Sequence, residues 1–125
     1  MTLELTPIPI AGNNKILNDT KELLGLPSNV TDFDLQLINH INSVLYTLTT
    51  IGVGEVNYQT TLTDGNLSLF VPNNEEIQAT LQMYIFMKVR LLFDPPSSSF
   101  VLTSLEAQLK ELEWRLVDLN YVPPV

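Results

Sequence analysis

The chain offers few residues whose types and spacing could support catalysis. His40 is the single histidine, so a Ser-His-Asp arrangement would have to use it as the general base. No nucleophile elbow lies near it, and its position beside the apolar stripe of a predicted helix favours a structural or surface role. Two acidic pairs, Asp32 with Asp34 and Glu75 with Glu76, could in principle exchange protons. Nothing in the sequence singles out either pair.

Signatures of metal and cofactor sites are also missing from the sequence. The chain has no cysteine, which excludes disulfides, thiolate catalysis and cysteine-based zinc sites. Asp32 and Asp34 lack the spacing of a calcium-binding loop. The segment Gly52-Val53-Gly54 lacks the third glycine and the preceding strand of a dinucleotide-binding loop. We therefore predict no catalytic residue, no metal ligand, no cofactor and no enzyme activity.

Composition limits the possible partners of the chain. Six basic and 14 acidic residues give a net charge of −8, which argues against direct binding of nucleic acid or of anionic membranes. Hydrophobic residues make up 45% of the chain and charged residues only 16%, against an average of about 25%. High apolar content with few charges suggests that a partner covers part of the surface, although a merely apolar monomer is the alternative.

The sequence shows no signal peptide and no transmembrane segment. The longest apolar stretch, Met83 to Phe93, is interrupted by Lys88 and Arg90 and is too short for a bilayer, which requires ~20 apolar residues. The first residues also lack a basic region followed by an apolar run. We expect a soluble protein that is made in a cytoplasm.

The chain is long enough for about one domain of ordinary size. Its pattern predicts a mainly α fold: a small antiparallel bundle of about four helices, with extended N- and C-terminal arms and a β-hairpin as a candidate insertion. We expect an N-terminal arm at 1–12, two helices within 13–51, a long loop or hairpin at 52–74, two helices within 75–117 and a C-terminal tail at 118–125.

Capping residues mark the first two predicted helices. Asn13 or Asn14 can begin the first, and Gly25 is well placed to end it. Thr31 is the predicted start of the second, which should end near Ile51. Apolar residues at spacings of three and four form one stripe along this second helix: Leu37, Ile38, Ile41, Val44, Leu45 and Leu48.

The segment between the two helix pairs resembles a β-hairpin. Residues 58–62 and 67–71 favour strands, and Asp64-Gly65 between them is a common two-residue hairpin turn. Because an isolated hairpin is marginal in water, it should pack on the helices or on a neighbouring subunit.

The third predicted helix, 75–93, is apolar on nearly every side. A helix of this kind is buried all round, so it must be the hub of the bundle or part of a subunit contact. Asp94-Pro95-Pro96 ends it, because proline cannot continue a helix and restricts the residue before it. Ser97 and its two neighbours offer caps for a fourth helix, which should fold back antiparallel to the third.

The fourth predicted helix has two apolar faces. At 100° per residue, one face forms a stripe that fits the core: Val101, Leu102, Leu105, Leu109, Leu112 and Leu116. Trp114 projects from the opposite face, near Ala107 and Phe100. Trp114 cannot reach the core from there, so we expect it to be buried against a neighbouring subunit or, alternatively, to be a lone exposed tryptophan.

Several of these stretches resemble the head–tail connector (adaptor) proteins of tailed bacteriophages and prophages. The resemblance is carried by Lys88–Leu102 and Leu109–Leu116, and extends to Ile16-Leu17 with Leu23–Leu26 and to Asp34–Val44. It covers roughly residues 16–116 and is weak between 52 and 72, and the two terminal arms fall outside it.

The resemblance implies a structural protein of the virion neck, assembled in the cytoplasm of a bacterial host. Such connectors join into a dodecameric ring beneath the portal protein. The ring extends the DNA channel, through which DNA passes without specific binding, and provides the docking surface for the next neck or tail-completion protein. These proteins are not enzymes, so the resemblance brings no catalytic residues.

A ring subunit must cover two different flanks, which gives the apolar surface of this chain a purpose. The candidate subunit-interface residues are Phe100, Ala107, Trp114, Tyr84 and Met87. The structural corner that would set the tilt between the two long helices is Asp94, Pro95 and Pro96. Candidates for contact with the portal or a neighbour, by strand addition, are Tyr58, Leu67, Phe70, Tyr121, Val122 and Val125.

Two other classes of function remain open on the sequence. One is a neck protein further down, such as a stopper or tail-completion protein, or a non-viral helical interaction module. The other is a small enzyme or ligand-binding bundle, which a buried polar pocket around His40 would favour.

Overall fold

The computed structural model describes residues 14–72 and 75–120, and this part of the chain is mainly α-helical. It contains five helices: α1 (Lys15–Leu24), α2 (Asp34–Thr50), α3 (Leu67–Phe70), α4 (Glu75–Phe93) and α5 (Ser99–Asn120). One isolated bridge pairs Asn14 with Gly65, and the described residues form no strand. The mainly α prediction is confirmed; the predicted arm at 1–12 lies outside the described residues.

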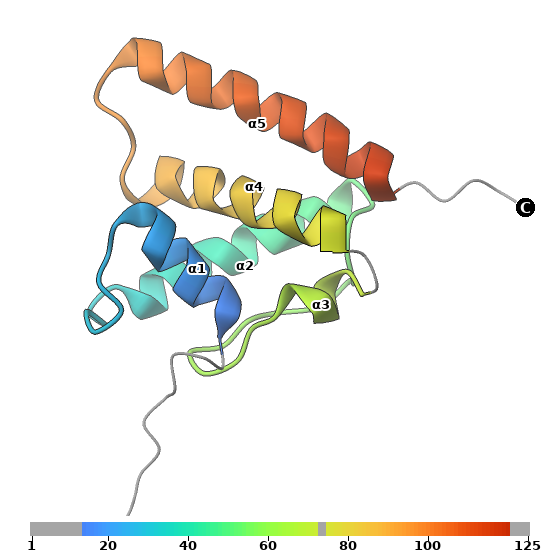
Figure 1. The fold of residues 1–125 in the computed structure, drawn as a ribbon, viewed down its shortest axis with the longest axis horizontal. Coiled ribbons are helices and arrows are strands. Elements are labelled where there is room, and N and C mark those ends of the chain that lie inside the picture. Colours follow the sequence, from blue (N-terminus) through green and yellow to red (C-terminus); the bar gives the residue numbers. More distant parts are fainter. Residues whose placement is uncertain (1–13, 73–74, 121–125) are drawn as a thin grey trace, which may run out of the picture.

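Helix α4 lies at the centre of the fold (Figure 1). It contacts each of the four other helices: α1 and α2 on one side, α5 on another, and the short α3 near its N-terminal end. The chain reverses at the corner after α4, so α5 runs antiparallel to it, as predicted. This central position matches the predicted role of hub, while a part in a subunit contact stays a prediction.

The local signals that predict α1 are confirmed in detail. The side-chain oxygen of Asn14 accepts a hydrogen bond from the backbone N–H of Leu17 at 2.9 Å, which satisfies one of the unpaired donors at the helix start. Gly25 ends the helix with φ of 81°, in the left-handed region that a residue without Cβ adopts at little cost.

Helix α2 begins at Asp34, three residues later than predicted. The backbone N–H of Asp34 donates to the carbonyl of Thr31 at 3.2 Å, so the residues between them form a turn. The ammonium group of Lys21 lies 2.9 Å from the Asp34 carboxylate and donates to the carbonyls of Ser28 and Val30 at 3.3 and 2.6 Å. These bonds fasten the α1–α2 connection to α1, and the chain becomes helical only after it.

The predicted hairpin is wrong, because residues 67–70 form the one-turn helix α3. The side-chain oxygen of Asn66 accepts from the backbone N–H of Ser68 at 2.9 Å and caps this turn. Leu67 and Phe70, which would point to opposite faces of a strand, are both buried by the helical spacing of three. Burial of both side chains favours the helical turn over the strand that their β propensity suggests.

Side-chain amides hold the connection before α3 in place. The Asn42 amide on α2 accepts from the backbone N–H and hydroxyl of Thr60 at 2.8 and 3.0 Å, and donates to its carbonyl at 3.1 Å. The amide of Asn14 donates to the carbonyl of Thr61, and the backbone N–H of Lys15 donates to that of Gly65 at 2.9 Å. Residues 53–66 therefore follow the surface of α1 and α2 instead of projecting from it.

Helix α5 is longer than predicted. Residues 118–120, assigned by the sequence pattern to the tail, continue the helix, because the next helix-breaking residue is Pro123. The side chain of Leu119 packs partly against the core. At the other end, the hydroxyl of Ser98 accepts from the backbone N–H of Val101 at 3.4 Å, as expected for one of the three candidate capping serines.

None of the helices that the structure describes combines the length and the apolar character needed to cross a membrane.

Candidate subunit interface on α5

Helix α5 leaves most of its surface uncovered. Only Leu109 and Leu116 are buried among its described side chains, although the helix has 22 residues. Phe100 and Trp114 are 81% and 78% exposed, and Ala107 between them is also exposed. These three residues are spaced by seven, which places them in one stripe on the side of α5 away from α4. We call this stripe the outer face of α5.

The structure separates the five residues that the sequence grouped as interface candidates. Phe100, Ala107 and Trp114 lie together on the outer face, as predicted. Met87 is only partly exposed and packs against the core. Tyr84 is fully buried inside the subunit, so it offers no side-chain surface to a neighbour in this conformation.

Tyr84 instead joins α4 to α5. Its hydroxyl donates a hydrogen bond to the carboxylate of Glu113 at 2.6 Å, which ties the two helices together. Burial of the ring, followed by the hydrogen bond to Glu113 and its negative charge, raises the pKa of Tyr84 well above its usual range. The tyrosine therefore stays protonated and keeps donating at neutral pH.

An apolar groove runs beside Trp114. It has a volume of about 420 Å³ and is lined by Ile51, Glu113, Trp114, Val117 and Asp118. Ile51, Trp114 and Val117 are exposed apolar side chains, and the two remaining residues place negative charge at its edge. We call it the Trp114 groove. From the sequence we predicted only that Ile51 lies at the end of a helix. A groove formed by two helices has no signature in the sequence of either helix, so its lining by Ile51 was not predictable.

A second groove lies between α2 and α4. It has a volume of about 250 Å³, and the residues that line it are Ser43, Val44, Thr47, Lys88, Leu91 and Leu92. Leu92 is 53% exposed, and the ammonium group of Lys88 lies 5.8 Å from the centre of the Tyr84 ring. Within the described residues Lys88 has no ion-pair partner. We call this the α2–α4 groove.

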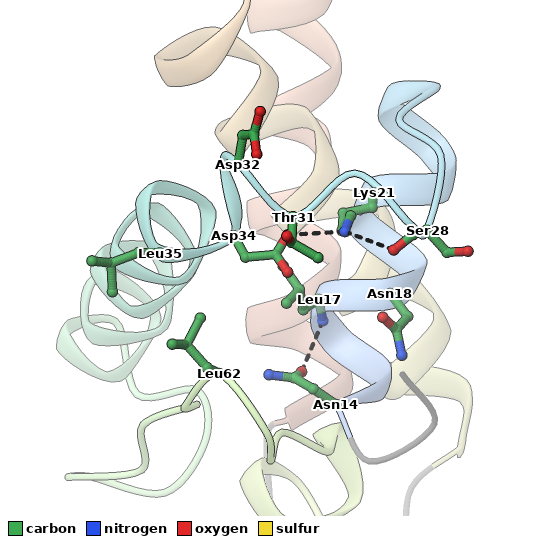
Figure 2. A pocket seen from close by; sticks show the side chains of 10 residues that line it. All are labelled: Asn14, Leu17, Asn18, Lys21, Ser28, Thr31, Asp32, Asp34, Leu35 and Leu62. Atoms are coloured by element: carbon green, nitrogen blue, oxygen red, sulfur yellow. Dashed lines mark hydrogen bonds and ion pairs between the residues drawn. The ribbon is translucent and has the colours of Figure 1, made fainter. Parts of the chain in front are cut away.

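The polar pocket beside the α1–α2 connection has a structural explanation (Figure 2). Its only cationic lining residue is Lys21, which is 3% exposed. The three acceptors named above, the Asp34 carboxylate and two loop carbonyls, already surround the Lys21 ammonium group. The pocket therefore presents no free cation to a ligand, and Lys21 serves to fix the loop.

The predicted portal contacts on the 52–74 segment face the subunit itself. Leu67 and Phe70 are buried, and the partly buried Tyr58 ring lies 5.9 Å from the Phe70 ring. The Tyr58 hydroxyl accepts from the backbone N–H of Asn66 at 2.7 Å. Gly54, at φ of 90°, lies so close to the Phe70 ring that any Cβ would overlap it. These contacts hold the segment against its own core.

Three other apolar side chains of this segment are exposed: Val56, Leu62 and Leu69. Because the hairpin was predicted from β-favouring residues, the contact candidates chosen from the sequence were Tyr58, Leu67 and Phe70 instead. The remaining candidates, Tyr121, Val122 and Val125, lie outside the described residues.

The position of His40 bears on the alternative of a small enzyme or ligand-binding bundle. His40 is partly buried on α2 and lines none of the grooves described above. The residues that the structure describes contain no group of three or more histidine or acidic side chains that could hold a metal ion. The candidate subunit interface therefore rests on the outer face of α5 and the two grooves.

Comparison with known families and proteins gives a match to a family. The family model described as phage connector protein matches residues 16–119. No curated protein and no solved structure gives a significant match.

Proposed function

The chain belongs to the phage connector protein family, and from that premise we propose that it is the head–tail connector that forms a ring directly beneath the portal. Membership in this family implies a structural role at the junction of head and tail. The finer assignment is ours: a dodecameric ring, with the portal protein above it and a neck or tail-completion protein below. The ring extends the channel through which DNA leaves the capsid.

The outer face of α5 is the observation that carries this proposal. A closed head-to-tail ring requires each subunit to cover two different surfaces with its neighbours. Trp114, largely exposed in the isolated subunit, is the type of residue that anchors protein interfaces. Because α5 packs mainly on α4, its outer face is free to meet another copy.

The acidic charge of the chain suits a channel component. With a net charge of −8, the ring as a whole repels the phosphate backbone. DNA would therefore pass the ring without binding to it.

The corner between α4 and α5 gives the interface a fixed direction. Pro95 and Pro96 stand in the short connection between Phe93 and Ser99. Proline restricts both its own backbone and that of the residue before it. This corner therefore sets the angle of α5 to the core, and through it the angle between neighbouring subunits.

Deletion of the gene in the phage or prophage that encodes the chain tests the proposal. We expect DNA-filled heads and separate tails that fail to join, with joining restored when the wild-type chain is supplied from a plasmid. Normal yields of joined particles from the deletion would overturn the proposed function.

Chemical crosslinking of intact particles distinguishes the connector from a protein lower in the neck. A connector beneath the portal should give crosslinks to the portal protein and to its own copies. A stopper or tail-completion protein would crosslink to other neck or tail proteins and not to the portal.

A further inference from the structure

We propose that the Trp114 groove of one copy docks onto the α2–α4 groove of the next copy, so that the two grooves are the two halves of one head-to-tail contact. This inference rests on the proposed ring and adds to it which surface meets which. The occupant of each groove is thus a second copy of this chain.

The two grooves are offset from each other along the antiparallel α4–α5 pair. The hydrogen bond between Tyr84 and Glu113 fixes the register of the two helices. Lys88 lies four residues beyond Tyr84, toward the corner, and Asp118 lies five beyond Glu113 in the other direction. A rise of 1.5 Å per residue separates Lys88 from Asp118 by about 13 Å along the helix axes. The grooves of one copy therefore do not cover each other, whereas those of successive copies can.

Both grooves present apolar side chains that the subunit leaves exposed. The Trp114 groove contributes the Trp114 ring and Val117, and the α2–α4 groove contributes the half-exposed Leu92 beside Leu91, which is partly buried against the core. Contact between the two removes these side chains from water, which is the main favourable term in protein association. A large aromatic residue on one side and a groove on the other is the usual arrangement at the centre of an interface.

The charges at the two edges are opposite. Glu113 and Asp118 border the Trp114 groove, while Lys88 borders the α2–α4 groove and has no ion-pair partner among the described residues. Docking brings Lys88 of one copy toward the acidic edge of the other. Complementary charges of this kind guide association and fix its register.

The same charges disfavour the symmetric alternative. If two copies met through their Trp114 grooves, Glu113 and Asp118 of one would face the same two residues of the other. Like charges placed together across an interface are destabilising. A twofold contact also covers only one surface per copy and cannot continue into a ring.

Engineered disulfides test the pairing, since the natural chain has no cysteine. Val117→Cys and Leu92→Cys each change an exposed side chain, one in each groove, so both variants should fold. A chain carrying both substitutions is incorporated into particles and oxidised. We expect covalent ladders of the chain, up to the full ring, on a non-reducing gel. Incorporation of the two single variants together should give dimers and no longer products.

Three outcomes of this experiment would contradict the pairing or the proposed function. Homodimers from Val117→Cys alone would show a symmetric contact, and particles that contain the doubly substituted chain without any crosslink would show that the grooves do not meet. Either result would overturn the pairing and leave the proposed function standing. Absence of the chain from particles that are otherwise complete would instead overturn the proposed function.

Charge reversal supplies an independent readout. We expect Lys88→Glu and Asp118→Lys each to reduce particle joining at least tenfold, and co-expression of the two variants to restore it, because an alternating ring pairs every charge again. Lys15→Glu, which reverses an exposed lysine on α1 outside both grooves, is the matched control and should leave joining unchanged. Failure of co-expression to restore joining would contradict the proposed pairing.

Discussion

Helices α4 and α5 are of similar length, 19 and 22 residues, and both are rich in apolar side chains. The rest of the subunit nevertheless covers them very differently. Helix α4 contacts every other helix and buries Ile77, Leu81, Tyr84, Ile85 and Val89, whereas α5 packs mainly on α4 and buries two residues among those described. Apolar content alone therefore does not distinguish a helix that stabilises the subunit from one that is available to a partner.

The arrangement of the apolar residues around each helix makes the difference. In α4 they occupy nearly the whole circumference, and neighbouring helices cover most of it. In α5 one stripe meets α4, and a second, with Phe100 and Trp114, faces away. Two separate stripes on one helix require two packing partners, and the subunit supplies one.

Truncation of a central side chain should have the largest effect on stability. Leu81 on α4 is fully buried, so Leu81→Ala should lower the free energy of unfolding by about 3 kcal/mol. Leu102 on α5 is only partly buried, and Leu102→Ala should cost about 1 kcal/mol, because less apolar surface is lost from the core. Urea denaturation followed by circular dichroism measures both, and equal losses would mean that α5 is as central as α4.

Removal of the link between the two helices should have an intermediate effect. Tyr84→Phe deletes the hydroxyl that donates to Glu113 and should lower the free energy of unfolding by about 2 kcal/mol at neutral pH. Tyr46→Phe is the matched control: Tyr46 is 72% exposed, so its variant should unfold like the wild type. A loss as small as that of the control would show that the bond contributes nothing to stability.

The same variant should change how stability depends on alkaline pH. Burial and Glu113 raise the pKa of Tyr84 in the folded state above its value in the unfolded chain, about 10. Its contribution is therefore complete below about pH 10 and is lost as the pH rises toward the folded-state pKa. Urea denaturation between pH 8 and 11.5 should show a smaller decline above pH 10 for Tyr84→Phe than for the wild type. Parallel declines would contradict this linkage.

Substitution of the exposed tryptophan should have the smallest effect on the free subunit. Trp114→Ala should change the free energy of unfolding by no more than about 0.5 kcal/mol, because the side chain has few contacts to lose. The same substitution should reduce particle joining strongly, since the neighbour loses its anchor. Tyr46→Ala, at a similarly exposed aromatic residue, is the control for joining, and normal joining by Trp114→Ala would show that Trp114 is not an anchor.

Features set by neighbouring residues along the chain were predictable from the sequence. The cap at Asn14, the stop at Gly25, the corner at Pro95 and the antiparallel return of α5 depend on local geometry, and the structure confirms each of them. The outward position of Trp114 follows from helical periodicity alone and is confirmed as well. Its role as an interface residue stays a prediction.

Features decided by tertiary contacts were not predictable in this way. Tyr84 could not be recognised as a core residue, because an apolar pattern around the whole of α4 does not show which side faces α5. Two hydrogen bonds between distant positions hold the segment that was predicted as a hairpin: the backbone N–H of Thr60 donates to the Asn42 side chain, and that of Glu55 donates to the carbonyl of Phe70. The two grooves each need two helices and have no signature in either.

A density map of the neck in intact particles, at a resolution that shows side chains, tests the central claim most directly. We expect a ring of this chain against the portal, with Trp114 of every copy covered by the α2 and α4 helices of the adjacent copy. A ring in which Trp114 faces solvent or the channel, or a neck that lacks the chain, would contradict the account.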